Sequence, residues 1–549
     1  MTDLLASILY GDWILHALIW LPLAGTAHVL VSSAERARNV AFRWSAFVFV
    51  LSLGLWWAYD PGDGGFAMQS SAPWIEAWGV SYSLGIDGIS VFMVLLTTFT
   101  SAIAILGSFE YVKTRRKAFY ALMLLLETGV VGFFLATDVF LFYVFFELTL
   151  VPMYFIVGIW GGERRIYAAV KFFLFTATGS LLMLVAILYV YFAGGTGSFA
   201  YDAFLNAGMS LREQLWLFAA FALAFGIKVP VFPLHTWLPD AHVEAPTPGS
   251  VVLASVLLKM GTYGFLRFLL PFFPEAAQHP AVVAVMLALG VVGIIYAAWV
   301  AAVQPDAKKL VAYTSVAHMG FVVIGVFALT LNGLQGGMVV MISHGISTGA
   351  LFLLLGMMYE RRHSRLIEDF GGIGRAAPWF ATAFAITALA SIGLPGTSGF
   401  VGEFLALLGT FETHMATGAI AATGVVFAAY YMLPMVQRVL FNELDKPENR
   451  KFADLSRREI AILAPLVALM IWIGVHPTPI LERTEPSVQA VLERVEDARM
   501  HAGGGEDAAT GAAGGFRSFA PAGDGPAADP APSGAPAAPR AAGPPGGGR

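Results

Sequence analysis

The chain has 549 residues, of which 57% are hydrophobic and 13% are charged, against about 25% charged residues in soluble globular domains. This composition excludes an ordinary soluble protein, and the net charge of -5, spread between apolar runs, argues against a nucleic-acid partner. The chain contains no cysteine, which excludes disulfides, thiolate zinc sites and Cys-ligated iron–sulfur clusters within it.

Apolar stretches of about 20 residues, long enough to cross the hydrocarbon core as helices, recur along the chain. The N-terminus, Met1-Thr2-Asp3, lacks the basic region of a secretory signal, so the first stretch is interpreted as a retained helix. We predict an all-α polytopic membrane protein with about fourteen transmembrane helices. They begin near Trp13, Val40, Ile89, Ala118, Val139, Tyr167, Gln214, Gly249, Ala281, Lys309, Leu334, Trp379, Gly418 and Ile460.

Basic residues are concentrated in one set of alternate loops. Six of the seven loops in this set hold lysine or arginine, as at Arg36, Lys113, Arg164, Lys308, Arg361 and Arg438. The opposite set includes the acidic segment 60–63 and is almost free of basic residues except Arg212. By the positive-inside rule the basic loops face the cytoplasm. We therefore expect a multi-pass protein of the bacterial inner membrane with both termini on the periplasmic side.

From Ala502 onward the sequence consists largely of glycine, alanine and proline. Such a segment buries too little apolar surface to offset the entropy lost on ordering. We expect a disordered tail over residues 502–549 that has no catalytic role.

Ionisable residues inside the apolar spans are the strongest functional signal. Each costs about 2.5 to 3.5 kcal/mol at the centre of a membrane helix and therefore needs a partner or a function. The candidates are Glu127, Glu147, Lys228, Lys259, His318, His344 and Glu403. Three of them, Glu147, Lys228 and Lys259, lie deep in separate helices and must meet one another or water, which favours a functional role.

For other residues, a structural role competes with a functional one. Arg267 lies near a helix end and is interpreted as a snorkelling anchor. Taken alone, His344 is more often a satisfied core histidine, and for Glu127 a structural and a functional role stay equally open. His235 and His242 share a loop with acidic residues, but we interpret them as interfacial loop residues rather than metal ligands.

Helix breakers lie beside two of the buried ionisable residues. Pro230 and Pro233 follow Lys228, and the segment 393–399 precedes Glu403. Proline removes a backbone donor, and the freed polar groups are tolerated in a membrane only beside protein or water. Broken helices beside ionisable residues are typical of transporters. The two breaks are separated by roughly 170 positions, as are other candidate residues, which favours an internal repeat.

Three stretches of the sequence carry long motifs. They are HTWLPDAHVEAPT at residues 235–247, AYTSVAHMGF at 312–321 and GFVGEF at 399–404. These stretches resemble the antiporter-like subunits of respiratory complex I, the proton-translocating NADH:quinone oxidoreductase, and the similarity extends from about Leu84 to Val475. The resemblance implies fourteen helices with two inverted five-helix repeats, each containing a discontinuous helix.

The same resemblance divides the chain and orders its buried ionisable residues. The divisions are 1–110 (helices 1–3), 111–275 (first repeat), 276–445 (second repeat), 446–501 (last helix and flank) and 502–549 (tail). The implied proton path consists of Glu147 and Lys228 as the input pair, Lys259 as the central relay, His318 and His344 as connecting residues and Glu403 as the terminal group. Glu110, before Tyr111, matches a further acid of the family.

Within the family, the chain M type has glutamate at the terminal position where sister subunits and stand-alone antiporters generally have lysine. Glu403 therefore favours the chain M type. The implied function is that of a translocase subunit that couples NADH oxidation and quinone reduction in its partners to proton pumping. NADH, FMN, iron–sulfur clusters and quinone would be bound by partner subunits, with no cofactor or metal in this chain. The expected partners are the lipid bilayer and other membrane-arm subunits, including sister antiporter-like subunits.

Two alternatives remain open at this point. One is a subunit of a multisubunit Na+/H+ antiporter or of a membrane-bound hydrogenase, which Glu403 argues against. The other is a structural scaffold of the membrane arm whose buried charges only hold helices together.

Overall fold

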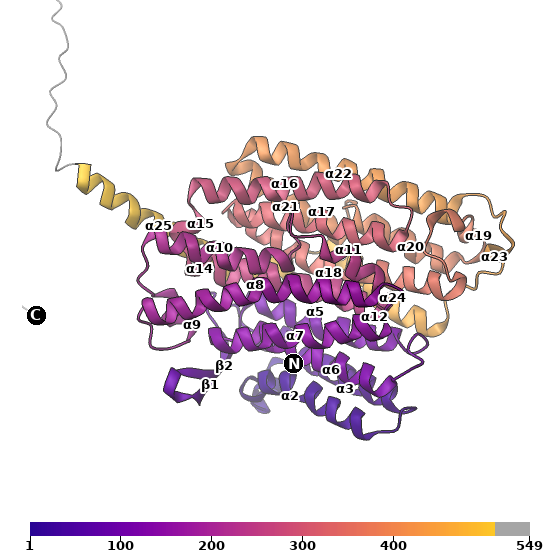
Figure 1. Cartoon of the computed structure of the whole chain (residues 1–549), viewed down its shortest axis with the longest axis horizontal. Coiled ribbons are helices and arrows are strands. Elements are labelled where there is room, and N and C mark those ends of the chain that lie inside the picture. The colour runs from indigo at the N-terminus through magenta and orange to yellow at the C-terminus, as the bar shows by residue number, and fades with distance from the viewer. Residues whose placement is uncertain (511–549) are drawn as a thin grey trace, which may run out of the picture. The chain divides into compact units, whose positions relative to one another are not determined.

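The structure is a computed structural model that describes the backbone of residues 1–510 and the side chains of residues 1–498. One compact unit comprises Met1–Ala502, and a second comprises Gly503–Arg549. In the first unit, long helices lie side by side (Figure 1). The predicted tail is described only as far as Thr510, where it continues the last helix; residues 511–549 lie outside the described residues.

The N-terminal part joins four helices, a hairpin and a long fifth helix. These elements are α1 (Thr2–Ser7), α2 (Tyr10–Val31), α3 (Ala37–Ser52), α4 (Leu55–Ala58), β1 (Ala67–Ile75), η1 (Glu76–Trp78), β2 (Val80–Ile86) and α5 (Gly88–Gly107). The antiparallel β1–β2 hairpin departs from the all-α prediction. Its local cause is the alternation of Val80, Tyr82 and Leu84 with serines, together with Gly79, which has a φ of 63° at the turn.

Two groups of helices follow. The first contains α6 (Arg116–Leu135), α7 (Val139–Trp160), α8 (Arg165–Ala193), α9 (Tyr201–Leu205), α10 (Leu211–Lys228), α11 (Trp237–Glu244), α12 (Thr247–Val252), η2 (Leu253–Leu257), α13 (Leu258–Gly264), η3 (Phe265–Leu269), α14 (Leu270–Phe272) and α15 (Pro274–Ala277). The second contains α16 (Pro280–Ala302), α17 (Ala307–Phe327), α18 (Leu331–Arg362), η4 (Ile367–Asp369), α19 (Ile373–Ala376), α20 (Pro378–Ser391), α21 (Ser398–Thr413), α22 (Met415–Val436) and η5 (Gln437–Phe441). The described chain ends with α23 (Pro447–Arg450), α24 (Arg457–Val475) and α25 (Thr478–Thr510).

Among the described residues, 12 helical segments are long and apolar enough to cross a membrane. The other two expected spans, beginning near Gln214 and Trp379, correspond to the interrupted pairs α10–α11 and α20–α21. The predicted discontinuous helices are therefore present, whereas the count of fourteen is not confirmed. Each group has three long helices, a broken helix and a further long segment. Since five spans is an odd number, the second group runs in the opposite sense to the first.

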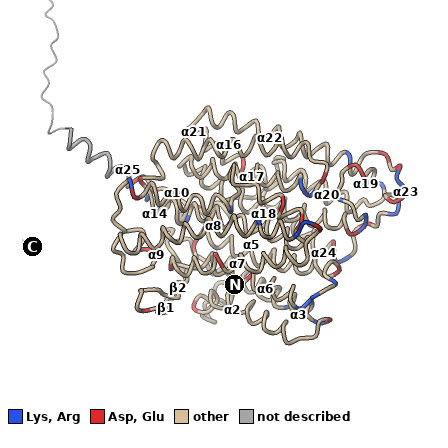
Figure 2. Tube along the Cα trace, in the orientation of Figure 1, with Lys and Arg blue, Asp and Glu red and all other residues tan. Residues whose placement is uncertain are grey.

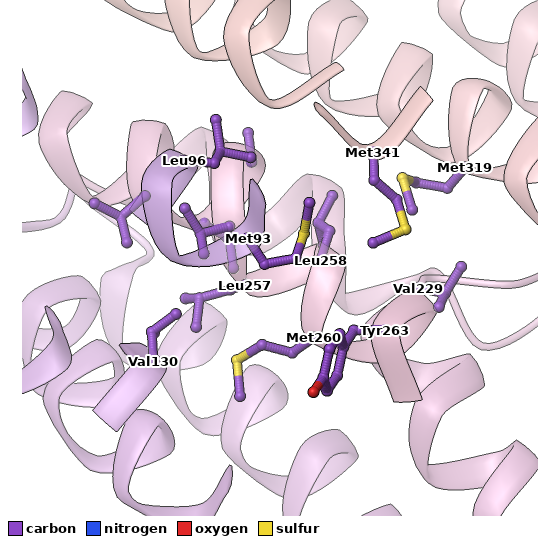
Figure 3. Packing of buried hydrophobic residues seen from close by; sticks show 14 of the residues in the cluster. Met93, Leu96, Val130, Val229, Leu257, Leu258, Met260, Tyr263, Met319 and Met341 are labelled. Atoms are coloured by element: carbon purple, nitrogen blue, oxygen red, sulfur yellow. The ribbon is translucent and has the colours of Figure 1, made fainter. Parts of the chain in front are cut away.

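The segment from α12 to α14 lies at the centre of the first unit and is completely buried there. Figure 3 shows its residues Leu258 and Met260 among Met93 of α5, Val130 of α6 and Met341 of α18. Two of its turns, η2 and η3, are π-helical. This segment carries Lys259 in α13, so helices from both groups fix the position of that residue.

Charged residues are unevenly placed along the helices. Figure 2 shows lysine and arginine gathered where α3 begins and near α19 and α23, with few charges along the middle of the helices. This end carries the loops for which the sequence predicts a cytoplasmic position.

Candidate functional site

A series of buried ionisable side chains begins at Lys259. This residue is fully buried, and its ammonium group donates a hydrogen bond of 2.6 Å to the carbonyl of Ala254 in the π-helical turn η2. The same ammonium nitrogen lies 2.6 Å from Nδ1 of His344 on α18. π-helical turns are frequent at functional sites, and here the turn supplies a backbone acceptor for the lysine.

The series continues through two histidines to Glu403. The rings of His344 and His318 have centroids 5.6 Å apart, and Nδ1 of His318 lies 2.6 Å from Oε1 of Glu403. The second ring nitrogen of His318 is 3.5 Å from the hydroxyls of Ser391 and Tyr431. The four sequence-predicted residues Lys259, His344, His318 and Glu403 are thus brought together. Ser391 and Tyr431 were not predicted, because hydroxyl residues in apolar spans give no distinctive sequence signal.

The break between α20 and α21 positions Glu403. Gly393 in this break has a φ of 76°, and a Cβ placed on it would lie 3.1 Å from a carboxylate oxygen of Glu403. A Cβ on Gly402 would lie 2.5 Å from the backbone nitrogen of Val340, so α21 and α18 approach each other through a small residue. A small cavity lined by His318, His344, Ser343, Ser347, Ser391 and Glu403 lies at this contact.

Glu147 and Lys228, the predicted input pair, are apart. Glu147 lies on α7, and one of its carboxylate oxygens is buried without a hydrogen-bond partner. The Lys228 ammonium, at the end of α10, lies 4.9 Å from the ring centroid of Phe146 and 5.8 Å from that of Phe172. Within the described chain, no nitrogen–oxygen distance of 4.0 Å or less joins Lys228 to Glu147. The lysine is instead held against aromatic rings, a favourable cation–π arrangement.

The two remaining candidates lie outside the series from Lys259 to Glu403. Glu127 on α6 is 1% exposed, and neither of its carboxylate oxygens has a hydrogen-bond partner. Glu110 lies in the turn after α5, where its side chain is 68% exposed and forms an ion pair of 2.8 Å with Arg458. The structure therefore places Glu127 in the interior and Glu110 at the surface.

The interpretation of Arg267 as a snorkelling anchor is wrong. Arg267 lies in η3, is 6% exposed and forms an ion pair with Asp87. The Asp87 carboxylate also caps α5 by accepting hydrogen bonds from the backbone N–H groups of Ile89 and Ser90. The two partners are 180 positions apart in the sequence, so local spacing gave no indication of the pair.

The interpretation of His235 and His242 as interfacial loop residues is also wrong. Their exposed fractions are 3% and 0%. The His242 ring stacks on Phe352 with centroids 4.5 Å apart, and neither of its nitrogens has a hydrogen-bond partner. His242 belongs to α11, the second half of the broken helix, and His235 to the connection between α10 and α11, and both lie in the interior of the first unit.

Comparisons with known proteins place this arrangement in a family. A family model described as NADH:quinone oxidoreductase/Mrp antiporter, TM, matches residues 136–428. The chain is 44% identical over 499 residues to NADH-quinone oxidoreductase subunit M of Rhodobacter capsulatus, covering 87% of this chain and 96% of that protein. It is 41% identical over 483 residues to subunit M of Rickettsia typhi, covering 86% and 97%.

The chain belongs to the subunit M family of NADH-quinone oxidoreductases. The subunit M fold is found in a chain of respiratory complex I from Thermus thermophilus with bound NADH, with a TM-score of 0.81, 33% identity and coverage of 88% of this chain and 99% of that one. A chain of the Mrp complex from Dietzia sp. gives a TM-score of 0.75 at 22% identity, covering 86% of this chain and 52% of that one, which is a similarity of fold. The predicted family and fold class are confirmed, and subunit M is a membrane subunit of complex I.

Proposed function

We propose that protons cross this subunit M through its own buried ionisable side chains. The observation that supports this proposal is the series Lys259, His344, His318 and Glu403, in which two contacts are 2.6 Å long. A neutral imidazole has one nitrogen that donates and one that accepts, so each histidine can receive a proton on one side and release one on the other.

The proposed transfer has three steps, which lead from the last segment of the first group of helices into the second group. The Lys259 ammonium gives a proton to Nδ1 of His344, with which it is already in contact. Between the two imidazole rings there is no direct hydrogen bond within the described residues, so a water molecule in the cavity that both histidines line carries the proton to His318. His318 then passes the proton to Glu403, beside the break in the helix.

Glu147 and Lys228 control the input in this proposal. The open arrangement of the pair corresponds to a lysine that has lost the support of its carboxylate partner. A closed pair at about 4 Å gains roughly 4 kcal/mol at an effective dielectric constant near 20. Moving one charge against 100 mV costs about 2.3 kcal/mol. Opening and closing one such pair therefore involves enough energy to drive one proton.

In our proposal, the groups that carry out the redox reactions of the complex are bound outside this chain. NADH, FMN, iron–sulfur clusters and quinone are bound by partner subunits, which agrees with a chain that contains no cysteine. Sister antiporter-like subunits of the membrane arm are its neighbours. The basic loops face the cytoplasm of a bacterial cell and both termini face the periplasm, as the distribution of lysine and arginine favours.

Replacement of Lys259 by methionine tests the proposal. In the assembled complex, Lys259→Met should reduce NADH-driven proton uptake by membrane vesicles several-fold, because the first donor of the series is lost. Lys113→Met, in an exposed loop, is the matched control and should pump normally. Assembled-complex content is measured in parallel. Normal pumping by Lys259→Met would refute the path, and loss of assembly without a change in pumping per complex would favour the scaffold alternative.

A further inference from the structure

An apolar groove lies between α3, α4, α5, α18 and α24. Its volume is about 650 Å³, and every residue that lines it is apolar, including Trp56, Leu95, Ile342 and Trp472. α3 with α4, α5, α18 and α24 are all candidate membrane spans, so the groove lies at the depth of the hydrocarbon core. Its volume is within the range of roughly 300 to 1,000 Å³ typical of ligand sites.

The side chains that line the groove favour a flexible chain over a helix as the occupant. Membrane helices pack on one another through small residues, as α18 and α21 do here at Gly336 and Gly402. The groove has no glycine and a single alanine, Ala468, and its walls are mostly bulky side chains such as Trp56 and Phe92. A hydrocarbon chain with free rotation can follow such a surface, whereas a regular helix would leave voids against it.

A cationic side chain lies at one end of the groove. The guanidinium carbon of Arg483 on α25 is 4.3 Å from the ring centroid of Trp56. Its terminal nitrogens donate to the carbonyls of Trp56 at 3.4 Å and Pro479 at 3.3 Å, and its Nε has no partner. Arginine binds phosphate through paired N–H groups, and tryptophan is enriched at membrane interfaces. The exposed Glu482 is adjacent to Arg483 and offsets its positive charge. We therefore expect the site to bind the phosphate of a phospholipid without a preference for lipids that carry a net negative charge.

We propose that a phospholipid occupies this groove, with one acyl chain between α5, α18 and α24 and its phosphate at Arg483. Ile342 and Ile346 of α18 line the groove. His344 is two residues from each of them and therefore lies about 200° away around the helix, on the face that contacts Lys259. The acyl chain therefore packs against the face of α18 that is opposite to His344.

Photolabelling of the intact complex tests this site. The complex is depleted of lipid with detergent and reconstituted into vesicles of phosphatidylcholine that carries a diazirine in one acyl chain. Peptide mass spectrometry after illumination should find label on the groove residues of α5 and α24. Leu95→Trp, which fills the groove, should lower this labelling at least fivefold. The control Leu181→Trp, at an exposed position of α8, should leave it unchanged.

Two further variants keep the test decisive. Leu53→Trp, at the 38% exposed rim of the groove, replaces Leu95→Trp if the latter does not assemble, and the same fivefold loss is expected. Arg483→Gln should reduce the phosphatidylcholine retained in the groove after a detergent wash several-fold. Absence of label in the groove of the wild-type complex while α8 is labelled would overturn the proposal, as it would show that protein covers the groove. Equal labelling of wild type and groove-filling variants would overturn it as well.

Discussion

Nδ1 of His318 lies 2.6 Å from a carboxylate oxygen of Glu403, although the two residues belong to different helices and are 85 positions apart. The exposed fractions of the two residues are 4% and 5%, so water competes little for this contact. This nitrogen–oxygen distance is shorter than the roughly 2.9 Å typical of N–H···O hydrogen bonds, so the two side chains are in close contact. The contact joins α17 to α21 immediately after the helix break.

Glu403→Ala should lower proton pumping strongly, because His318 loses the acceptor of this contact. Glu403→Lys should retain part of the pumping, since lysine is also titratable. Glu412→Ala, an exposed position on the same helix, should pump normally. The measurement is proton translocation by NADH-energised vesicles, with electron transfer and complex content followed in each variant. Equal pumping by Glu403→Ala and wild type at equal content would show that Glu403 is a structural carboxylate.

Glu147→Gln should leave the complex assembled yet remove most of its proton pumping. Glutamine preserves the size of the side chain, and one Glu147 oxygen has no hydrogen bond to lose, but the neutral amide cannot form an ion pair with the Lys228 ammonium. Glu147→Asp should retain part of the activity. Glu163→Gln, in the exposed connection between α7 and α8, is the control. Full pumping by Glu147→Gln would remove this carboxylate from the mechanism.

Arg267→Leu should reduce the amount of assembled complex. It leaves the Asp87 carboxylate buried without its partner, and breaking a buried ion pair on one side costs about 3 to 5 kcal/mol. Pumping per assembled complex should remain near normal, because the pair lies outside the proposed path. The exposed Arg212→Leu should change neither quantity. Complex content by native electrophoresis and the melting temperature in detergent provide the readouts, and an unchanged melting temperature would contradict the expectation.

Gly336→Ala should destabilise the contact between α18 and α21. A Cβ at this position would lie 2.2 Å from the backbone nitrogen of Ala406, so the helices must separate. Overpacking of this kind typically costs about 1 to 3 kcal/mol. The shift moves His344 relative to Glu403, so pumping should fall together with the melting temperature. At Gly208 an added Cβ meets nothing within 4 Å, and Gly208→Ala should behave as wild type.

Removal of residues 502–549 should leave assembly and activity near normal, as the composition of this segment predicts. Removal from Thr478 onward should reduce assembly, because Ser487, Val488 and Val491 of α25 are buried in the first unit and the Ser487 hydroxyl accepts a hydrogen bond from Gly88. Complex content of the two truncations is compared directly. Failure of the shorter truncation to assemble would show that the tail contacts a partner.

Much of the fold was predictable from the sequence, since the hydropathy of a membrane span and the cost of a buried charge are local properties. Pro230 and Pro395 marked the two discontinuous helices because a missing backbone donor is visible in the sequence. The β1–β2 hairpin was missed because a short alternating segment is a weak signal beside long apolar runs. Lys259 and Glu403 were found as isolated charges in apolar spans.

Contacts between distant segments could not be predicted in the same way. The pairing of Arg267 with Asp87 and the burial of His242 depend on how helices far apart in the sequence pack against one another. The sequence resemblance grouped Glu147 with Lys228 as a pair, whereas the structure presents them apart, because a matching motif carries no distance between two side chains. The burial of Arg267 shows that a charge near a helix end is not a sufficient sign of a membrane surface.

The two π-helical turns on either side of Lys259 make this helix sensitive to its length in residues. Each π turn holds about one residue more than an α turn, and one residue corresponds to about 100° of rotation in an α-helix. Deletion of a single codon within residues 253–257 would allow η2 to close into an ordinary turn, and Lys259 would keep its direction because the residue removed is the extra one that the π turn holds. Insertion of a single codon into the α-helical start of the span, residues 247–252, would instead rotate Lys259 by about 100° away from His344. The span would still be apolar and long enough for the bilayer, but such a frame-preserving insertion would disconnect the series while leaving every one of its ionisable residues in the chain.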